Sequence, residues 1–441
     1  MSTVKLTIDN RQAEVEKGAT ILDAARTLGI NIPTLCHMKL HDLNVENKPG
    51  ACRICVVEVN GRRNLAPACK TECTEGMVVS THSPRVLTSR QTVMELILSN
   101  HPKDCLVCIK NGDCELQTLA AELGIRNIRY AGEMSEFKQD LSPSLERNMD
   151  KCIMCRRCEM ACNEVQAVGA LSATQRGFGS VVTTSFGDPI ETTNCINCGQ
   201  CVAVCPTGAL AEHSNIEEVL KALGDPTKTV IVQTAPAVRV GLGQSFGYSG
   251  KSVTGKMVAA LRQLGFDRVF DTDFTADLTI MEEGTELLQR LAKLLNGEDV
   301  KMPLMTSCCP GWVSFCEKHY PELLPNLSTA KSPMEMFGAV AKNYLAPRMD
   351  VDRKDMVVVA VMPCVAKKAE RARPEFSKDG IPDVDIVITP RELARMIRSA
   401  NLNFNALHDS DFDKATGESS CAAVTLGATG GVIETAVPTS Y

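Results

Sequence analysis

One cysteine pattern occurs twice in the middle of this sequence and restricts its fold more than any other feature. Residues 152–162 read CIMCRRCEMAC and residues 195–205 read CINCGQCVAVC, and both have the spacing C-x2-C-x2-C-x3-C. In bacterial ferredoxins with this spacing, three cysteines of one motif bind a [4Fe–4S] cluster and the fourth binds the neighbouring cluster. We therefore predict two clusters with exchanged fourth ligands, one bound by Cys152, Cys155, Cys158 and Cys205, and the other by Cys195, Cys198, Cys201 and Cys162.

The chain has 21 cysteines among 441 residues, and its N-terminus lacks the basic and apolar segments of a secretory signal. These features predict a cytoplasmic protein whose thiols stay reduced and bind metal rather than form disulfides. Charges are mixed, with 47 Lys and Arg against 53 Asp and Glu, and aromatic residues make up only 4%. This composition argues against nucleic-acid binding. No apolar run reaches the length of about 18 residues that a membrane span requires.

Two further ligand groups precede the repeated motif. Residues 1–78 begin with an alternating pattern that predicts a β-hairpin, and four of their cysteines suit a [2Fe–2S] cluster of the plant-ferredoxin type: Cys36, Cys52, Cys55 and Cys69. Cys73 is left over and is predicted to be structural. Residues 79–140 are rich in helix formers and hold one histidine and three cysteines: His101, Cys105, Cys108 and Cys114. Such a set is also common in structural zinc sites, but its place between iron–sulfur modules favours a [4Fe–4S] cluster.

The second half of the chain has a different sequence pattern. Short β-branched runs, namely KTVIVQTAPAV, KMPLMTS, DMVVVAVMPCV and DVDIVITP, alternate with helical patterns, which predicts an α/β domain with a mostly parallel sheet. The segments TAPA, TSCC and MPCV each follow an apolar run directly. Because ligands of such sheets gather beyond the carboxyl ends of the strands, we expect Cys308, Cys309 and Cys364 to meet at one point.

The segments TSCCPGW (306–312) and MPCVAKKAE (362–370) resemble the first two active-site motifs of the iron-only ([FeFe]) hydrogenases. The resemblance covers nearly the whole chain, and the order of the cluster motifs is similar to that of the NAD(P)-linked members. It implies a multidomain α+β and α/β protein with four parts. These are a β-grasp [2Fe–2S] domain (1–78), a small helical [4Fe–4S] domain with one histidine and three cysteine ligands (79–140), a bacterial 2[4Fe–4S] ferredoxin domain (141–215) and an α/β catalytic domain (216–441).

The resemblance also implies an H-cluster, in which a [4Fe–4S] cubane is joined to a two-iron unit that carries CO and cyanide. By this resemblance Cys309 and Cys364 bind the cubane, and Cys308 stays free as the last carrier of the proton. Lys367 donates to an iron-bound cyanide, and Glu370 gives structural support. The implied wall of the two-iron unit consists of Ala235, Pro236, Ala237 and Met362. The implied proton path consists of Glu283, Glu286 and Ser328, although two acids at this spacing usually mark a solvated helix face.

One departure from the family pattern bears on activity. The third motif, which supplies two more cysteines, should follow GATGGV (427–432), yet after Cys364 the sequence offers only Cys421. We therefore expect a truncated or partial hydrogenase with an incomplete H-cluster. Its 441 residues alone should carry electrons without making hydrogen.

The resemblance implies reversible H2 oxidation and proton reduction, with one [2Fe–2S] and three accessory [4Fe–4S] clusters as the electron relay. The expected partners are ferredoxin or an NAD(P)-handling flavoprotein, with formate dehydrogenase as a further candidate, in a hetero-oligomer. The alternative is a non-catalytic electron-transfer or sensory subunit without a complete H-cluster. A subunit of the respiratory complex I type would share the first three cluster sites, but the motifs TSCCPGW and MPCVAKK argue against a complex I subunit.

Overall fold

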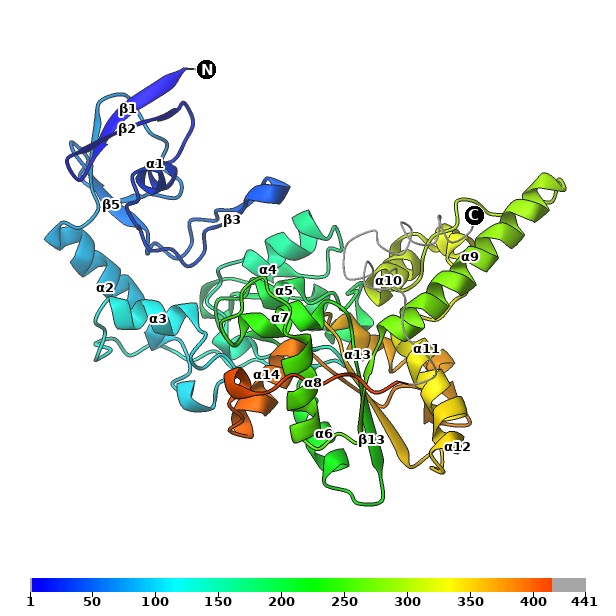
Figure 1. Ribbon diagram of the computed structural model, residues 1–441. Coiled ribbons are helices and arrows are strands. Elements are labelled where there is room, and N and C mark those ends of the chain that lie inside the picture. The colour runs from blue at the N-terminus through cyan, green and yellow to red at the C-terminus, as the bar shows by residue number, and fades with distance from the viewer. Residues whose placement is uncertain (1, 415–441) are drawn as a thin grey trace. The chain divides into compact units, whose positions relative to one another are not determined.

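The computed structural model describes residues 2–414 and divides into two compact units. The first unit comprises Met1–Cys195 and Gln200–Glu212, and the second comprises Ile196–Gly199 and His213–Tyr441. Figure 1 colours the chain by residue number, so that each unit can be followed on its own. Among the described residues, no helix has the length and apolar character needed to cross a membrane.

The N-terminal part of the first unit is a five-stranded sheet with the order β2-β1-β7-β5-β6. Its strands are β1 (Thr3–Ile8), β2 (Arg11–Glu16), β5 (Val56–Val59), β6 (Ala66–Pro67) and β7 (Met77–Ser80). β1 and β2 form the predicted hairpin, and Asp9 and Asn10 make its turn with φ values of 47° and 64°. Helix α1 (Ile21–Thr27) starts at a capping box between Thr20 and Asp23 and packs its apolar side chains on the sheet.

The rest of the first unit consists of short elements joined by the loops that hold the cysteines. Its helices are α2 (Pro84–Ser99), α3 (Glu115–Glu122), α4 (Arg157–Met160) and α5 (Gln200–Ala203). Its strands are β3 (Met38–Leu40), β4 (Val45–Asn47), β8 (Asp140–Leu141), β9 (Leu145–Arg147), β10 (Ser172–Thr174), β11 (Val181–Thr183) and β12 (Leu210–Glu212). β3 pairs with β4, β10 with β11, and β9 lies between β12 and β8. Each copy of the repeated motif thus runs from a loop into a short helix.

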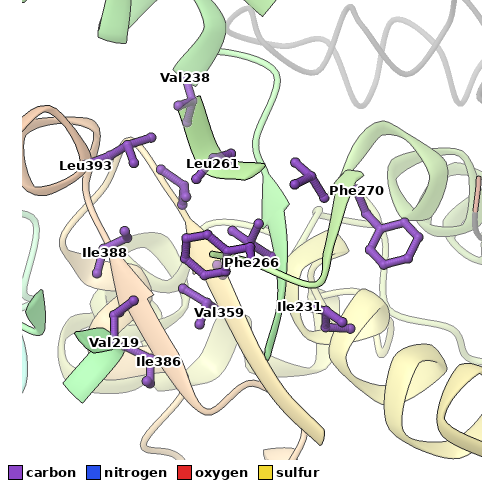
Figure 2. Packing of buried hydrophobic residues seen from close by; sticks show 14 of the residues in the cluster. Val219, Ile231, Val238, Leu261, Phe266, Phe270, Val359, Ile386, Ile388 and Leu393 are labelled. Carbon is purple, nitrogen blue, oxygen red and sulfur yellow. The ribbon is translucent and has the colours of Figure 1, made fainter. Parts of the chain in front are cut away.

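The second unit is built on a parallel sheet, as predicted, with the order β14-β13-β15-β18. The strands are β13 (Thr229–Thr234), β14 (Arg268–Asp271), β15 (Met356–Val361) and β18 (Ile386–Ile388), beside the small pair β16 (Ser377–Lys378) and β17 (Ile381–Pro382). The helices are α6 (Ile216–Leu223), α7 (Val238–Gln244), α8 (Thr254–Gln263), α9 (Asp273–Leu295), α10 (Pro310–His319), α11 (Pro333–Val340), α12 (Ala346–Arg348), α13 (Ala366–Glu370) and α14 (Pro390–Ser399). Figure 2 shows Ile231 and Val359 of the central strands in the same core as Leu261 of α8 and Leu393 of α14.

Two details of the sheet differ from the sequence-based expectation. The run KMPLMTS forms no strand and makes only a single parallel bridge between Met305 and Leu327. Pro303 lies within this run, and a proline has no backbone N–H to donate to a neighbouring strand. Conversely, the short run RVFD was not predicted as a strand but forms β14, where Val269 and Phe270 are buried in the core.

Candidate iron–sulfur and active sites

The four cysteines of the first predicted ligand set lie together in the first unit, and all four are buried. The Sγ atoms of Cys55 and Cys69 are 3.4 Å apart. A hydrogen bond between the thiols of Cys36 and Cys52 raises the pKa of Cys36 and lowers the pKa of Cys52 to about 6. The hydrogen bond with Cys55 raises the pKa of Cys69, and the thiols of Cys36 and Cys52 contribute to that rise. Four sulfurs gathered at one place fit the donor set of a [2Fe–2S] cluster.

The second predicted set is more open to solvent. Cys105 is exposed and begins the short helical turn Cys105–Val107, while Cys108 and Cys114 are half-buried. Burial raises the pKa of Cys114, and the nearby thiols of Cys108 and Cys105 contribute. Burial lowers the pKa of His101 to about 4, so its imidazole is neutral, as metal ligation requires. Within residues 2–414, no group of three or more His, Cys, Asp or Glu side chains has the arrangement that would hold a single metal ion.

The repeated motif brings together cysteines from both of its copies. Cys158, on α4, is buried, and burial is the main reason that its pKa is raised. The thiols of Cys155, Cys205, Cys201 and Cys152 raise this pKa further. Cys205 belongs to the second copy of the motif, and it also raises the pKa values of Cys152 and Cys155. Its place among the cysteines of the first copy is the arrangement that an exchanged fourth ligand requires.

The remaining predicted ligand set spans several loops. Cys195 and Cys201 lie near the buried guanidinium of Arg147. Burial lowers the pKa of Arg147, and the two cysteines oppose this shift. Cys162 Sγ accepts a hydrogen bond from the backbone N–H of Ala170 at 3.3 Å. Cys198 is half-buried in the loop Ile196–Gly199.

That loop packs against the catalytic part of the second unit. Gly199 has a φ of +74°, and a Cβ atom built on it would lie 2.4 Å from Cγ2 of Val365. A Cβ atom on Gly311 would lie 3.7 Å from the carbonyl oxygen of Ile196. Val365 follows Cys364 directly and Gly311 follows Cys309 by two residues. The loop of Cys198 therefore touches the neighbours of both predicted cubane ligands.

The loops that carry TSCC and MPCV meet at one place, as expected, although the run before TSCC forms no strand. Cys309 is the residue before α10, and Cys364 lies between β15 and α13. Burial raises the pKa of Cys364, and the thiol of Cys309 contributes to that rise. Lys367 Nζ donates to the Cys308 carbonyl oxygen at 2.9 Å and to Glu370 Oε2 at 2.8 Å. This pair of bonds places an ammonium beside the two adjacent cysteines.

Cys308 itself is half-buried. Burial raises the pKa of its thiol; the Lys367 ammonium opposes this rise, and the Glu283 carboxylate adds to it. The predicted wall residues Ala235, Pro236 and Ala237 lie between β13 and α7, and Met362 follows β15. Ala235 and Met362 are buried. The thiol is thus close enough to a cation and to an acid for both charges to act on its pKa.

The two acids of α9 are held in a hydrogen-bonded line rather than on a solvated face. Ser328 Oγ donates to Glu286 Oε2 at 3.1 Å, and the Ser328 hydroxyl also acts to lower the pKa of Glu283. Arg290 pairs with Glu286 at 2.6 Å, and the backbone N–H of Ser307 donates to Glu283 Oε1 at 3.4 Å. Burial raises the pKa of Glu283. Burial also acts to raise the pKa of Glu286, but hydrogen bonds from Thr329, Arg290 and Ser328 lower it overall.

Sequence reasoning missed one acid near this site. Glu335, on α11, is fully buried, and neither of its carboxylate oxygens has a hydrogen-bond partner within the described part of the chain. Its pKa is raised to about 8, mainly by burial; Glu370 and Asp383 contribute to the rise, and Lys367 and Lys331 oppose it. In the sequence it stands among apolar residues in KSPMEMFG, which is a signal for burial but not for proximity to Lys367.

Known protein families and curated relatives resemble this chain along most of its length. Four family models match: the 2Fe-2S iron-sulfur cluster binding domain over residues 1–84, the NADH-ubiquinone oxidoreductase-G iron-sulfur binding region over 90–129, the 4Fe-4S dicluster domain over 144–209, and the iron only hydrogenase large subunit, C-terminal domain over 228–441. The NADP-reducing hydrogenase subunit HndD of Solidesulfovibrio fructosivorans is 60% identical over 444 residues, which is 100% of this chain and 76% of that protein. Iron hydrogenase 1 of Clostridium pasteurianum is 41% identical, over 98% of this chain and 74% of that protein.

Among solved structures, an [FeFe]-hydrogenase studied for oxygen inactivation of its H cluster is 41% identical. The match covers 52% of this chain and 57% of that chain, with a TM-score of 0.48. The matched domains define an iron–sulfur oxidoreductase with [2Fe–2S] and [4Fe–4S] binding parts and an α/β catalytic part. Given its identity to these relatives along nearly its whole length, the chain belongs to the iron-only hydrogenase family.

The predictions of family, fold class and enzyme class are therefore confirmed. The assignment of individual residues to clusters and to the proton path stays a prediction. Cys421 and the segment GATGGV lie outside the described residues.

Proposed function

We propose that this chain supplies the site of Cys308, Cys309 and Cys364 to a hydrogenase that interconverts protons and H2, with the further cubane ligands lying outside these 441 residues. One [2Fe–2S] and three [4Fe–4S] clusters would carry the electrons, in four parts bounded as the sequence predicts (1–78, 79–140, 141–215 and 216–441). The observation that carries the proposal is the position of the Cys308 thiol. Lys367 Nζ donates to the carbonyl oxygen of Cys308, and the charges of Lys367 and Glu283 both act on the pKa of the Cys308 thiol.

The donor set at this site fits the family's cofactor. Cys309 and Cys364 would hold the cubane, and Lys367 has donors that suit an anionic ligand such as cyanide. Ala235, Pro236, Ala237 and Met362 would form the wall of the adjacent space. When bound, the H-cluster would supply the two-electron chemistry of H2. The protein residues would position this cofactor, exclude water and deliver protons.

The line of polar side chains offers a route for those protons. Burial gives Glu283 a raised pKa, so this carboxyl can hold and release a proton nearer to neutral pH than an exposed acid. Ser328 would link the two acids, because its hydroxyl donates to Glu286 and can also accept a proton from a protonated Glu283. Arg290 holds Glu286 in place from the outer side. The final transfer would run from Glu283 to the thiol of Cys308.

Electrons would reach the active site through the loop of Cys198, because this loop packs against Val365 and Gly311. At the other end, the exposed loop of Cys105 would bring a cluster close to solvent, where a partner could exchange electrons. An NADP-linked partner is supported by the name of the relative from Solidesulfovibrio fructosivorans, an NADP-reducing hydrogenase subunit. The NADPH-Fe(3+) oxidoreductase subunit alpha of Geobacter sulfurreducens is also 40% identical over 47% of this chain.

The catalytic proposal is tested with the full-length gene product, matured and purified without oxygen. Reduced methyl viologen should drive H2 evolution, and Cys308→Ala should abolish most of it without loss of iron. Cys316→Ala is the matched control, because Cys316 is a buried thiol on α10 that is not among the predicted ligands. Full iron loading with no H2 evolution in the unmodified protein would favour the electron-transfer subunit instead.

The electron partner is tested separately, by supplying the reduced protein with ferredoxin or with an NAD(P)-handling flavoprotein. We expect NADP⁺ reduction only when the flavoprotein is present. Equal rates with ferredoxin alone would contradict the NADP-linked assignment without touching the catalytic one.

A further inference from the structure

One asparagine joins two of the predicted cluster sites in the first unit. Asn47 is the last residue of β4, and its side chain is buried. Its Nδ2 atom donates to the carbonyl oxygen of Cys36 at 2.6 Å and to the carbonyl oxygen of Cys155 at 3.0 Å. Cys36 belongs to the [2Fe–2S] ligand set, and Cys155 belongs to the set of Cys152, Cys158 and Cys205. A single amide group thus spans two ligand sets, and Asn47 and Cys155 are 108 residues apart in the sequence.

The surroundings of this amide keep the two ligand sets in close contact. Cys36, Cys52 and Cys155 pack in one apolar cluster with Leu35, Ile54, Met94, Leu116 and Leu119. Cys52 and Cys152 also line the same pocket, of about 570 Å³. Because the amide lies among buried side chains, water competes little for its two hydrogen bonds.

A buried arginine fixes the same region from another side. Arg157, next to Cys158, donates to both carboxylate oxygens of Glu115 at 2.7 and 3.0 Å. It also donates to the carbonyl oxygen of His37, next to Cys36, at 3.4 Å. Arg157 therefore clamps the loops together, whereas Asn47 contacts the ligand residues themselves.

We propose that Asn47 is a positioning residue that couples the [2Fe–2S] cluster electronically to the cluster of Cys152, Cys155, Cys158 and Cys205. This proposal rests on the proposed function, because it requires that both ligand sets bind their iron–sulfur clusters. Electron tunnelling weakens steeply across gaps that no bond bridges, and the amide replaces such a gap with two hydrogen bonds. One electron leaves the reduced [2Fe–2S] cluster and enters the oxidised [4Fe–4S] cluster, and no proton moves.

Because of its position, the amide should affect the rate of electron transfer between the clusters but not their reduction potentials. Reduction potentials respond to charge, solvent and hydrogen bonds at the sulfurs, whereas Asn47 donates to backbone carbonyls of the ligand residues. Its removal should therefore slow electron transfer between the two clusters and leave both potentials in place.

The test uses two variants of the full-length, cluster-loaded protein. Asn47→Ser keeps one O–H donor, which can serve only one of the two carbonyls, and Asn47→Leu keeps the approximate size without a donor. Asn163→Ser is the matched control, because Asn163 Nδ2 donates at 3.2 Å to the carbonyl of Leu171, which is not a predicted ligand. After rapid mixing with a reductant, freeze-quench EPR follows the electron from the [2Fe–2S] signal to the [4Fe–4S] signal, and equilibrium titrations give both potentials.

We expect the transfer to slow by about tenfold in both Asn47 variants, because each loses at least one of the two hydrogen bonds; this is the lower end of the loss of activity seen when a hydrogen-bond partner of a metal ligand is removed. The iron content, both potentials and the Asn163→Ser rate should stay as in the unmodified protein. Unchanged rates in both variants would overturn the proposal. Loss of the [2Fe–2S] signal in both would also overturn it, because Asn47 would then act in cluster assembly. Absence of either signal from the unmodified protein would instead contradict the proposed function.

Discussion

Replacing Lys368 with Met should destabilise the second unit far more than replacing an exposed lysine. Lys368 stands next to Lys367 in MPCVAKK, but it points into a different network. Its Nζ atom donates to Glu392 at 2.7 Å, to the Asn215 side chain at 2.8 Å and to the His213 carbonyl at 2.7 Å. The side chains of Lys368 and Glu392 are both completely buried. All three protons of the ammonium are thus used inside the protein.

The expected cost follows from what the change leaves behind. Lys368→Met would leave a buried, unpaired carboxylate on Glu392, and breaking such a pair from one side costs about 3–5 kcal/mol. The two remaining acceptors, on Asn215 and His213, would also lose a partner that water cannot replace. Domains are stable by only about 5–15 kcal/mol in total. Lys368→Met should therefore remove a large part of the stability of the second unit.

Urea unfolding followed by fluorescence measures this effect, because Trp312 on α10 is the single tryptophan of the chain and reports on the second unit. The control is Lys354→Met, which removes an ion pair with Asp352 whose side chains are 68% and 72% exposed. That pair should contribute less than about 1 kcal/mol. If Lys368→Met lowers the unfolding midpoint no more than Lys354→Met, the buried network does not stabilise the fold.

Three further predictions concern the site and its support. Ser328→Ala should lower H2 turnover by about 100-fold with unchanged iron content, because it breaks the link between the two acids of α9; turnover close to that of the unmodified protein would refute the proposed route. Glu335→Gln should stabilise the second unit progressively above about pH 4.5, because the unfolded state releases this proton there while the folded state keeps it up to a pKa of about 8. The gain should reach about 3 kcal/mol at pH 7 and be absent at about pH 4, as measured by urea unfolding. Gly199→Ala should cost about 1–3 kcal/mol more than Gly297→Ala, since both glycines have a positive φ but only the first would place its Cβ against Val365; equal unfolding midpoints would contradict this.

Local sequence patterns predicted those features that depend on residues close together in the chain. The spacing of the cysteines defined four candidate ligand sets, because most ligands of a cluster stand two or three residues apart in recognisable motifs and the distant fourth ligand follows from the repeated pattern. The apolar runs before TAPA and MPCV became β13 and β15, since a strand buried on both faces leaves a continuous β-branched signature. The loops of Cys308 and Cys364 do lie together, but the reason differs from the one expected, because Cys364 follows the strand β15 whereas the run before Cys308 forms no strand.

Tertiary structure decided which polar side chains work together across long separations. The sequence shows two adjacent lysines, but only the folded chain directs Lys367 to Cys308 and Lys368 to Glu392. Nothing in VENKPG marks Asn47 as a link between two ligand sets, and nothing in KSPMEMFG places Glu335 beside Lys367. Hydrophobic periodicity determines which face of an element is buried. It does not determine which distant donor meets which acceptor there, because that match depends on how separate segments pack in three dimensions.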